Sequence, residues 1–181
     1  MITLKNRFIA TTASLCAPFD ADSFMGQSYD GSLDTKIVLP PAGDYRAVIG
    51  DFTSETGFRS FVAGDKSKNP GKEYTLFQPP FVLQDDPKLA EVKAARDGND
   101  VIVYHKGMFL DLTDQGQLDF SKGKNVDLGL MRDAVGQNNK SGWKFADLIG
   151  AGPVMVKLIH EDDANDSTKK YARISRVIKI S

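Results

Sequence analysis

The sequence predicts a mainly β fold with one or two short helices and an extended N-terminal arm. Short segments in which apolar and polar residues alternate follow one another from residue 43 to the C-terminus. Clusters of Gly, Pro, Asn and Asp separate these segments, as expected of turns between strands. Helical spacing of apolar residues occurs only late in the chain, at residues 126–135 and more briefly at 145–149.

Composition limits the possible classes of protein. With 181 residues, 41% of them hydrophobic and 26% charged, the chain is long enough to form one domain with its own core. The formal net charge of −1 provides no overall attraction to nucleic acid or to an anionic membrane, so any such binding depends on local patches. The single cysteine, Cys16, cannot form an internal disulfide and is interpreted as a small apolar side chain.

No stretch of the sequence approaches the ~20 apolar residues of a membrane-spanning helix. The N-terminal residues do not have the continuous apolar region of a secretory signal. We therefore expect a cytoplasmic protein with no membrane partner.

Residues 1–40 are expected to form the arm. The segment ITLKNRFIA resembles a first strand, but the following residues are rich in Gly, Ser and Asp and have no regular period. The pair Pro40-Pro41 ends the arm because neither ring can donate to a sheet ladder. Since the arm carries several large apolar residues, we expect it to dock on residues 41–181 or on a neighbouring subunit. The apolar residues are Phe8, Ile9, Phe19, Phe24 and Tyr29.

Residues 41–181 are expected to form a series of strands. The first has Tyr45, Ala47 and Ile49 on one face. Two aromatic runs, 58–62 and 74–77, flank a loop containing Asn69-Pro70-Gly71 and should form a long hairpin. The segments VIVYH and MFLDL follow, and the strands PVMVKLIH and KKYARISRVIKI end the chain, joined by an acidic loop. In the last strand, Ala172, Ile174 and Ile178 are expected on one face and Tyr171, Arg173 and Lys179 on the other.

The segment LDFSKGKNVDLGLMRDAVGQN, residues 118–138, could be a phosphate cradle, a metal loop or a strand-to-helix junction. A P-loop requires a glycine five residues before Gly-Lys, which is absent here. A calcium loop starting at Asp111 would place Lys122 where the bidentate Glu belongs. The structural interpretation therefore remains.

In that interpretation, Asn125 is the N-cap of a helix of about three turns that Gly136 ends. The apolar stripe that should pack on the sheet consists of Val126, Leu130 and Ala134, with Met131 and Val135. The two lysines that precede the helix, Lys122 and Lys124, are either part of a solvated loop or contacts for a phosphate at the helix N-terminus.

Catalytic, metal and cofactor sites are not predicted. Both histidines, His105 and His160, lie at strand ends and no nucleophile or zinc spacing accompanies them. The carboxylates Asp111, Asp114 and Asp119 surround a hairpin turn, where Asp commonly forms local hydrogen bonds. The sequence therefore predicts a protein that is not an enzyme.

Aromatic and basic residues alternate along much of the chain. Binding of single-stranded nucleic acid uses this combination, since bases stack on rings while cations contact the backbone. The alternative, that the rings form the core and the cations keep the surface soluble, stays open for each residue. The candidate DNA-binding residues are Arg46, Arg59, Lys66, Lys68, Lys72, Tyr74, Phe77, Lys122, Lys124, Trp143, Lys144, Tyr171 and Arg173.

Three motifs carry a resemblance to a known family. They are the GDYRA strand, the LD-x-x-KGKN-x-x-LG-x-x-R-x-AVGQN helix and the W-x-F-x-x-L-x-G unit before the paired strands. In these motifs residues 40–181 resemble the single-stranded DNA-binding proteins encoded by tailed phages. The resemblance implies an OB-like Greek-key barrel in residues 41–181. The chain differs from many replication-type single-stranded DNA-binding proteins at the C-terminus, where it has ARISRVIKIS in place of their flexible acidic tail.

The resemblance and the aromatic-basic pattern together lead to one main hypothesis. The chain is expected to bind single-stranded DNA without sequence preference and to protect it during phage replication or recombination in a bacterial host. Phage or host replication and recombination proteins are a second class of partner, and a homo-oligomer is left open. The alternative is an interaction protein that uses the same fold to bind a host or replication protein, and a more distant one is a hydrolase using Asp111 to Asp119.

Overall fold

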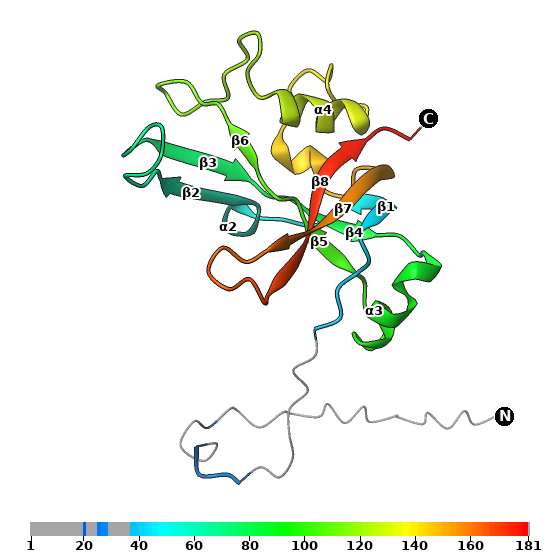
Figure 1. The fold of residues 1–181 in the computed structure, drawn as a ribbon. Helices are drawn as coiled ribbons and strands as arrows, with labels where there is room; N and C mark the ends of the chain where they lie inside the picture. The colour runs from blue at the N-terminus through cyan, green and yellow to red at the C-terminus, as the bar shows by residue number, and fades with distance from the viewer. Residues whose placement is uncertain (1–19, 21–24, 29–36, 181) are drawn as a thin grey trace, which may run out of the picture. The chain divides into compact units, whose positions relative to one another are not determined.

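The computed structural model describes residues 20, 25–28 and 37–180 (Figure 1). The chain divides into two units, residues 1–36 and 37–181, and the account below concerns the second. The predictions for the arm, including its docking and the environment of Cys16, fall outside the described residues.

The second unit is mainly β, as the sequence predicts, and consists of two antiparallel sheets with short helices (Figure 1). The larger sheet has the strand order β5-β4-β1-β7-β8, and the smaller has the order β2-β3-β6. The elements are β1 (Gly43–Ile49), α2 (Ser54–Gly57), β2 (Phe58–Val62), β3 (Glu73–Phe77), β4 (Pro80–Leu83), η1 (Pro87–Leu89), α3 (Ala90–Ala94), β5 (Ile102–Tyr104), β6 (Met108–Leu110), α4 (Val126–Ala134), η2 (Phe145–Leu148), β7 (Val154–Asp162) and β8 (Lys170–Ile178).

The larger sheet has one buried and one outward face because successive side chains along each strand point to opposite faces. On β1 the side chains of Tyr45, Ala47 and Ile49 are buried, which confirms the predicted alternation. β1 is the central strand and pairs with β4 on one side and β7 on the other. The inner face therefore forms most of the core.

The two edge strands of this sheet, β5 and β8, meet at one point. His105, which follows β5, forms a parallel bridge with Ile174 of β8. The backbone N–H of Lys106 donates to the carbonyl of Ile174 at 2.9 Å. Because His105 and Ile174 are both buried, the sheet curls around the core at this end.

The smaller sheet is attached to the core by one row of side chains. β2 and β3 form the predicted hairpin, in which Phe58 pairs with Phe77, and Phe77 pairs in turn with Met108 of β6. The rings of Phe58 and Phe77 stack at 4.9 Å, and Phe52 and Phe145 pack against them edge-on. The remaining length of the hairpin extends away from this aromatic cluster (Figure 1).

A bulge in β8 changes one predicted face. Leu158 pairs with Ile174, but Lys157 pairs with Arg176, so the register shifts by one residue at Ser175. Beyond the bulge Val177 pairs with the buried Val156, and Ile178 lies on the outward face. The prediction that Ile178 shares a face with Ala172 and Ile174 is therefore wrong, because a single extra residue reverses the alternation.

The helix α4 lies where the sequence predicts it, and Gly136 follows it with a φ of 72°. The predicted buried stripe is confirmed for Met131 and Ala134 and is wrong for Val126 and Leu130. Leu128, Met131 and Ala134 are buried, whereas Val126 and Leu130 are more than half exposed. The helix therefore packs through a face rotated from the predicted one.

Asn125 is at the N-cap position but its side chain does not cap the helix. Its Oδ1 accepts from the Asp111 amide at 2.9 Å, and its Nδ2 donates to the carbonyls of Asp111 and Asp119. Its backbone has a φ of 49°, a left-handed conformation that Asn tolerates better than most residues. The predicted role of Asn125 is corrected: its side chain closes the loop before the helix.

Truncation of two leucines on α4 tests which face is buried. Leu128→Ala should lower the free energy of unfolding by about 2–4 kcal/mol, since it leaves a cavity in the core. Leu130→Ala should change it by no more than about 0.5 kcal/mol, because that side chain is largely exposed. Denaturant unfolding of the two variants measures both values. Equal losses would contradict the observed rotation of the helix.

A buried histidine makes the stability depend on pH. Burial, with a smaller contribution from Lys106, lowers the pKa of His105 from 6.5 to about 4. The unfolded chain therefore takes up a proton at a higher pH than the folded chain does. Stability should be fully present above pH 6.5 and should fall as the pH is lowered toward 4.

Unfolding free energies measured across this pH range test the effect. His105→Gln should reduce the steepness of the decline between pH 6.5 and 4. An unchanged pH profile in His105→Gln would show that other groups cause the decline.

Candidate nucleic-acid interface

The outward side of the smaller sheet carries the best candidate surface. Because side chains alternate, the register that directs Phe58, Phe77 and Met108 inward directs the intervening residues outward. These outward residues form the surface that we term the aromatic face. It consists of Arg59 and Phe61 on β2, Tyr74 and Leu76 on β3, and Phe109 on β6.

Three rings on the aromatic face contact one another. Phe61 and Tyr74 are near-parallel, with centroids 5.7 Å apart, and Phe109 meets Tyr74 edge-on at 5.5 Å. Phe109 is 58% exposed although it is a large apolar residue. The ammonium group of Lys72 lies 5.2 Å from the centroid of Tyr74. Rings and a cation therefore occupy one surface, as stacking of unpaired bases requires.

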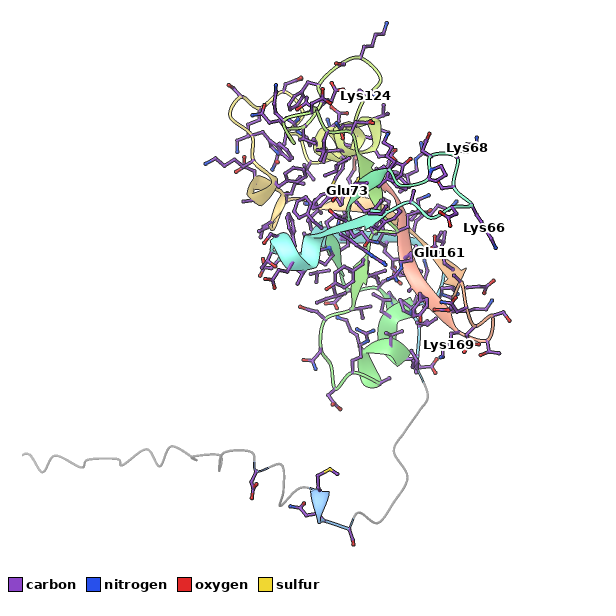
Figure 2. The ribbon with its side chains drawn as sticks, turned by 90° about the vertical axis from the view of Figure 1, so that its left-hand side faces the viewer. Lys66, Lys68, Glu73, Lys124, Glu161 and Lys169 are labelled. Carbon is purple, nitrogen blue, oxygen red and sulfur yellow. The ribbon has the colours of Figure 1, made fainter. Side chains whose placement is uncertain are left out.

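The loop between β2 and β3 is held beside these rings. The Ala63 amide donates to the Lys72 carbonyl at 2.8 Å, and the Asn69 side chain donates to the hydroxyl of Tyr74 at 3.2 Å. A shallow hollow lies between the loop and the rings, lined by Phe61, Ala63, Gly64, Ser67, Tyr74 and Phe109. Lys66 and Lys68 stand at the exposed end of this loop (Figure 2).

A second group of outward residues lies where β5 and β8 meet. His105 and Ile174 point inward at their bridge, so the preceding residues, Tyr104 and Arg173, point outward from adjacent strands. Tyr104 is 41% exposed. The Arg173 guanidinium lies 5.3 Å from the centroid of Tyr171.

Tyr171 is fixed at the start of β8. Its hydroxyl donates to Asp163 at 2.9 Å, and this hydrogen bond raises the pKa of Tyr171. The interaction orients the ring beside Arg173. It also places a carboxylate close to the basic group, which lowers the local attraction for phosphate.

The β5–β6 connection links the two groups. A Cβ added at Gly107 would lie 3.4 Å from Leu76 of the aromatic face, so the connection passes directly beside that face. The Gln78 side chain also donates to the Lys106 carbonyl at 3.2 Å. Tyr104 and Phe109 thus lie at the two ends of one short, anchored connection.

Two of the predicted residues are part of the core packing. Phe77 is completely buried, so the prediction that it contacts DNA is wrong. Trp143 is half-buried, and the Arg132 guanidinium covers its ring at 4.2 Å. The indole N–H of Trp143 donates to Gln137 at 2.9 Å, and its ring packs against Phe145 at 5.0 Å. The contacts of Trp143 indicate a structural role.

The other predicted residues lie apart from the aromatic face. Arg46 is on the central strand β1, two strands from either edge of the larger sheet. Lys124 forms an ion pair with Asp111 at 3.3 Å, and Lys122 is exposed in the same loop. Lys144 is exposed at the start of η2. The structure therefore brings together Arg59, Lys66, Lys68, Lys72 and Tyr74, and separately Tyr171 and Arg173.

Three ring residues, Phe61, Phe109 and Tyr104, are absent from the predicted set. The sequence indicates only that they lie in strands: Phe61 in the run 58–62, Tyr104 in VIVYH and Phe109 in MFLDL. The segment VIVYH has no alternation of apolar and polar residues, so its sequence does not show that Tyr104 points outward. Nothing in the sequence indicates that β6 would pair with β3 and bring Phe109 beside Tyr74.

The carboxylates of Asp111 and Asp119 accept hydrogen bonds from nearby backbone amides. Asp119 accepts from the Ser121 amide at 2.9 Å, and hydrogen bonding to Ser121 lowers the pKa of Asp119. Asp111 accepts from the Asn125 amide at 3.2 Å. Within residues 20, 25–28 and 37–180, no group of three or more His, Cys, Asp or Glu is placed to hold a metal ion.

None of the described helices is both long and apolar enough to cross a membrane. Comparison of the chain with protein-family models, with curated proteins and with solved structures gives no match. The functional argument therefore depends on the geometry of the chain itself.

Proposed function

We propose that this chain is a non-enzymatic protein that binds single-stranded DNA without sequence preference through the aromatic face. The observation that carries the proposal is the exposure of Phe109 beside Phe61 and Tyr74, with Lys72 against the same rings. Exposed rings that gather on one surface usually mark a binding site. Every base has a face that can stack on them, so binding of this kind does not depend on sequence.

The arrangement of strands supports an OB-like Greek-key barrel as the fold behind this function. In such barrels the second and third strands, with the loops after the first and fourth strands, bind oligonucleotides. In chain order, the five strands of the larger sheet are β1, β4, β5, β7 and β8. The segment after the first strand contains the β2–β3 hairpin, and the loop after the fourth is residues 163–169.

Both of these segments flank the proposed binding surface. The β2–β3 hairpin and the loop end of the β7–β8 hairpin project toward the same side of the molecule (Figure 1), and the rotated view shows Lys66 and Lys169 on that side (Figure 2). A strand leaving the aromatic face would next meet Tyr104, Arg173 and Tyr171. We infer that these residues extend the same interface.

The charges indicate binding of moderate strength that depends on salt. Arg59, Lys66, Lys68 and Lys72 lie on or beside the aromatic face, whereas Asp65 and Glu73 lie in the same hairpin. With a net charge of −1 for the chain, attraction to phosphate comes from this local group alone. Protection of exposed strands during phage replication or recombination in a bacterial host requires coverage more than tight binding, which fits this balance.

A second candidate function is that of an interaction protein that uses the same fold to bind a host or replication protein. The near-neutral charge and the acidic β7–β8 loop favour this alternative. A titration with fluorescent oligo-dT at low salt distinguishes the two candidate functions. Saturable binding that weakens with salt supports the DNA-binding function, and absence of binding supports the alternative.

Removal of one exposed ring tests the aromatic face. Phe109→Ala should weaken binding of oligo-dT by ~1–3 kcal/mol, because a base loses its stacking partner. The salt dependence should stay almost unchanged, since no cation is removed. Fluorescence anisotropy at several salt concentrations measures both quantities.

Phe120→Ala is the matched control, because Phe120 is 79% exposed and forms no ring contact with the aromatic face in the described part of the chain. It should bind like the parent. Parental affinity in Phe109→Ala would contradict the proposed site, and equal losses in both variants would extend it to the loop before α4.

Removal of one cation should leave a different signature. Lys72→Ala should weaken binding to all sequences and should reduce the slope of log affinity against log salt by about 0.7, the share of one single-strand phosphate. Arg96→Ala, an exposed site beyond α3, is the control and should keep the parental slope. An unchanged slope in Lys72→Ala would show that this lysine does not contact phosphate.

A further inference from the structure

A second hollow lies on a different part of the molecule, between α4 and the last residues of β8. It has a volume of about 470 Å³. One wall is the strand from Ser175 to Lys179, and the other is α4 (Figure 1). His105, Lys106 and Met108 form the end of the hollow. We term it the α4–β8 groove.

The strand wall of this groove has a free edge. β8 is an edge strand of the larger sheet, and on its open side only Ile174 is engaged, by His105 and Lys106. In the described part of the chain no strand pairs with that side of residues 175–178. Unpaired N–H and C=O groups in a row are a template for another extended segment.

A hydrogen-bond donor on a largely buried side chain also lines the groove. The Nδ1 of His105 accepts from the Gly107 amide at 3.0 Å, so the proton of the neutral ring is on Nε2. The side chain is only 5% exposed and lines the groove. Among the described residues no acceptor contacts Nε2, and this atom is not one of the fully buried unpartnered ones, so its N–H is free to donate to an oxygen of a ligand in the groove.

The walls are suited to aliphatic side chains. Met108 and Met131 form buried parts of the groove, while Leu130 and Ile178 are 57% and 41% exposed at its margins. No Phe, Tyr or Trp lines it, and its one aromatic ring, the imidazole of His105, is only 5% exposed, so a nucleic-acid base would find no open ring for stacking. The groove therefore differs in chemistry from the aromatic face.

The charges on the strand wall favour an anionic partner. Arg176 pairs directly with Lys157 of β7, so two like charges lie opposite each other. Lys106 and Lys179 lie nearby, and none of these cations forms an ion pair within the described residues. Asp127 and Asp133 are on the helix wall. A carboxylate beside Arg176 would relieve the repulsion on the strand.

We propose that the α4–β8 groove binds an extended peptide segment of a partner protein, which adds to β8 as a further strand. Alternation along β8 determines the pattern of this peptide. Residues beside Arg176 point outward and carry carboxylates, and residues beside Val177 point toward α4 and are aliphatic. The inference is independent of DNA binding, because it uses neither the aromatic face nor its cations.

A short blocked peptide of alternating Asp and Val is the probe. Added to the ¹⁵N-labelled full chain, it should produce saturable amide shifts at residues 175–178 and in α4, and none in the β2–β3 hairpin. Arg176→Glu should weaken binding by about fivefold, since an attractive cross-strand pair becomes repulsive. Arg96→Glu, the matched charge reversal, should bind the peptide like the parent.

Two further probes separate the alternatives. A peptide of alternating Lys and Val should bind more weakly than the Asp peptide, and equal binding would overturn the charge argument. Absence of saturable shifts, or shifts confined to other surfaces, would overturn the proposal as a whole. Shifts at residues 175–178 caused by oligo-dT, or by self-association at high protein concentration, would assign the groove to DNA or to a second copy instead.

Discussion

The arrangement of the candidate site depends on the attachment of the smaller sheet to the core through the row Phe58, Phe77 and Met108. Phe77 and Met108 are almost fully buried, and Phe58 stacks on Phe77. A small sheet needs an apolar face packed away from water to be stable, and this row provides that face. Successive side chains of a strand point to opposite faces. Burial of one row therefore requires that the next row faces outward, and this row contains Phe61, Tyr74 and Phe109. The stability of the fold and the exposure of the rings have the same origin.

The same alternation separates the two proposed sites in space. On the aromatic face rings and cations are exposed together, which suits unpaired bases. In the α4–β8 groove a free strand edge, aliphatic walls and the N–H donor of His105 occur together, which suits a peptide. The bridge between His105 and Ile174 lies between the two regions. The side chains of Tyr104 and Arg173, which precede the bridged residues, point outward. The free edge of β8 follows the bridge along the strand. The two proposed sites share no residue, so occupation of one does not require that the other be empty.

Much of the fold could be predicted from the sequence. The alternation in β1, the β2–β3 hairpin and the terminal pair β7–β8 are all visible as patterns, because one buried face imposes a period of two. The bulge at Ser175 could not be predicted, since an inserted residue has no distinctive sequence signal there. The sequence predicts only part of the buried face of α4, since it indicates Met131 and Ala134 but not Leu128. Leu128 and Leu130 are both apolar, and only the neighbouring strands decide which of them is covered.

The site was harder to predict than the fold. Aromatic residues in alternating positions show that a strand has two faces, but not which face enters the core. Phe77 and Tyr74 therefore looked equivalent, although one is completely buried and the other is on the surface. Trp143 has two lysines nearby in the sequence, yet its ring is covered by Arg132 from α4. Contacts between residues distant in sequence decided each case.

Photo-crosslinking tests the central claim most directly, because it identifies the side chains that touch the bases. Oligo-dT substituted with a photoreactive pyrimidine would be bound to the full chain at low salt, irradiated and analysed by peptide mass spectrometry. The account predicts crosslinks to Phe61, Tyr74 and Phe109, with Tyr104 as the next position along the strand. Crosslinks confined to Trp143 or to α4, or no crosslinks under conditions of saturation, would contradict it.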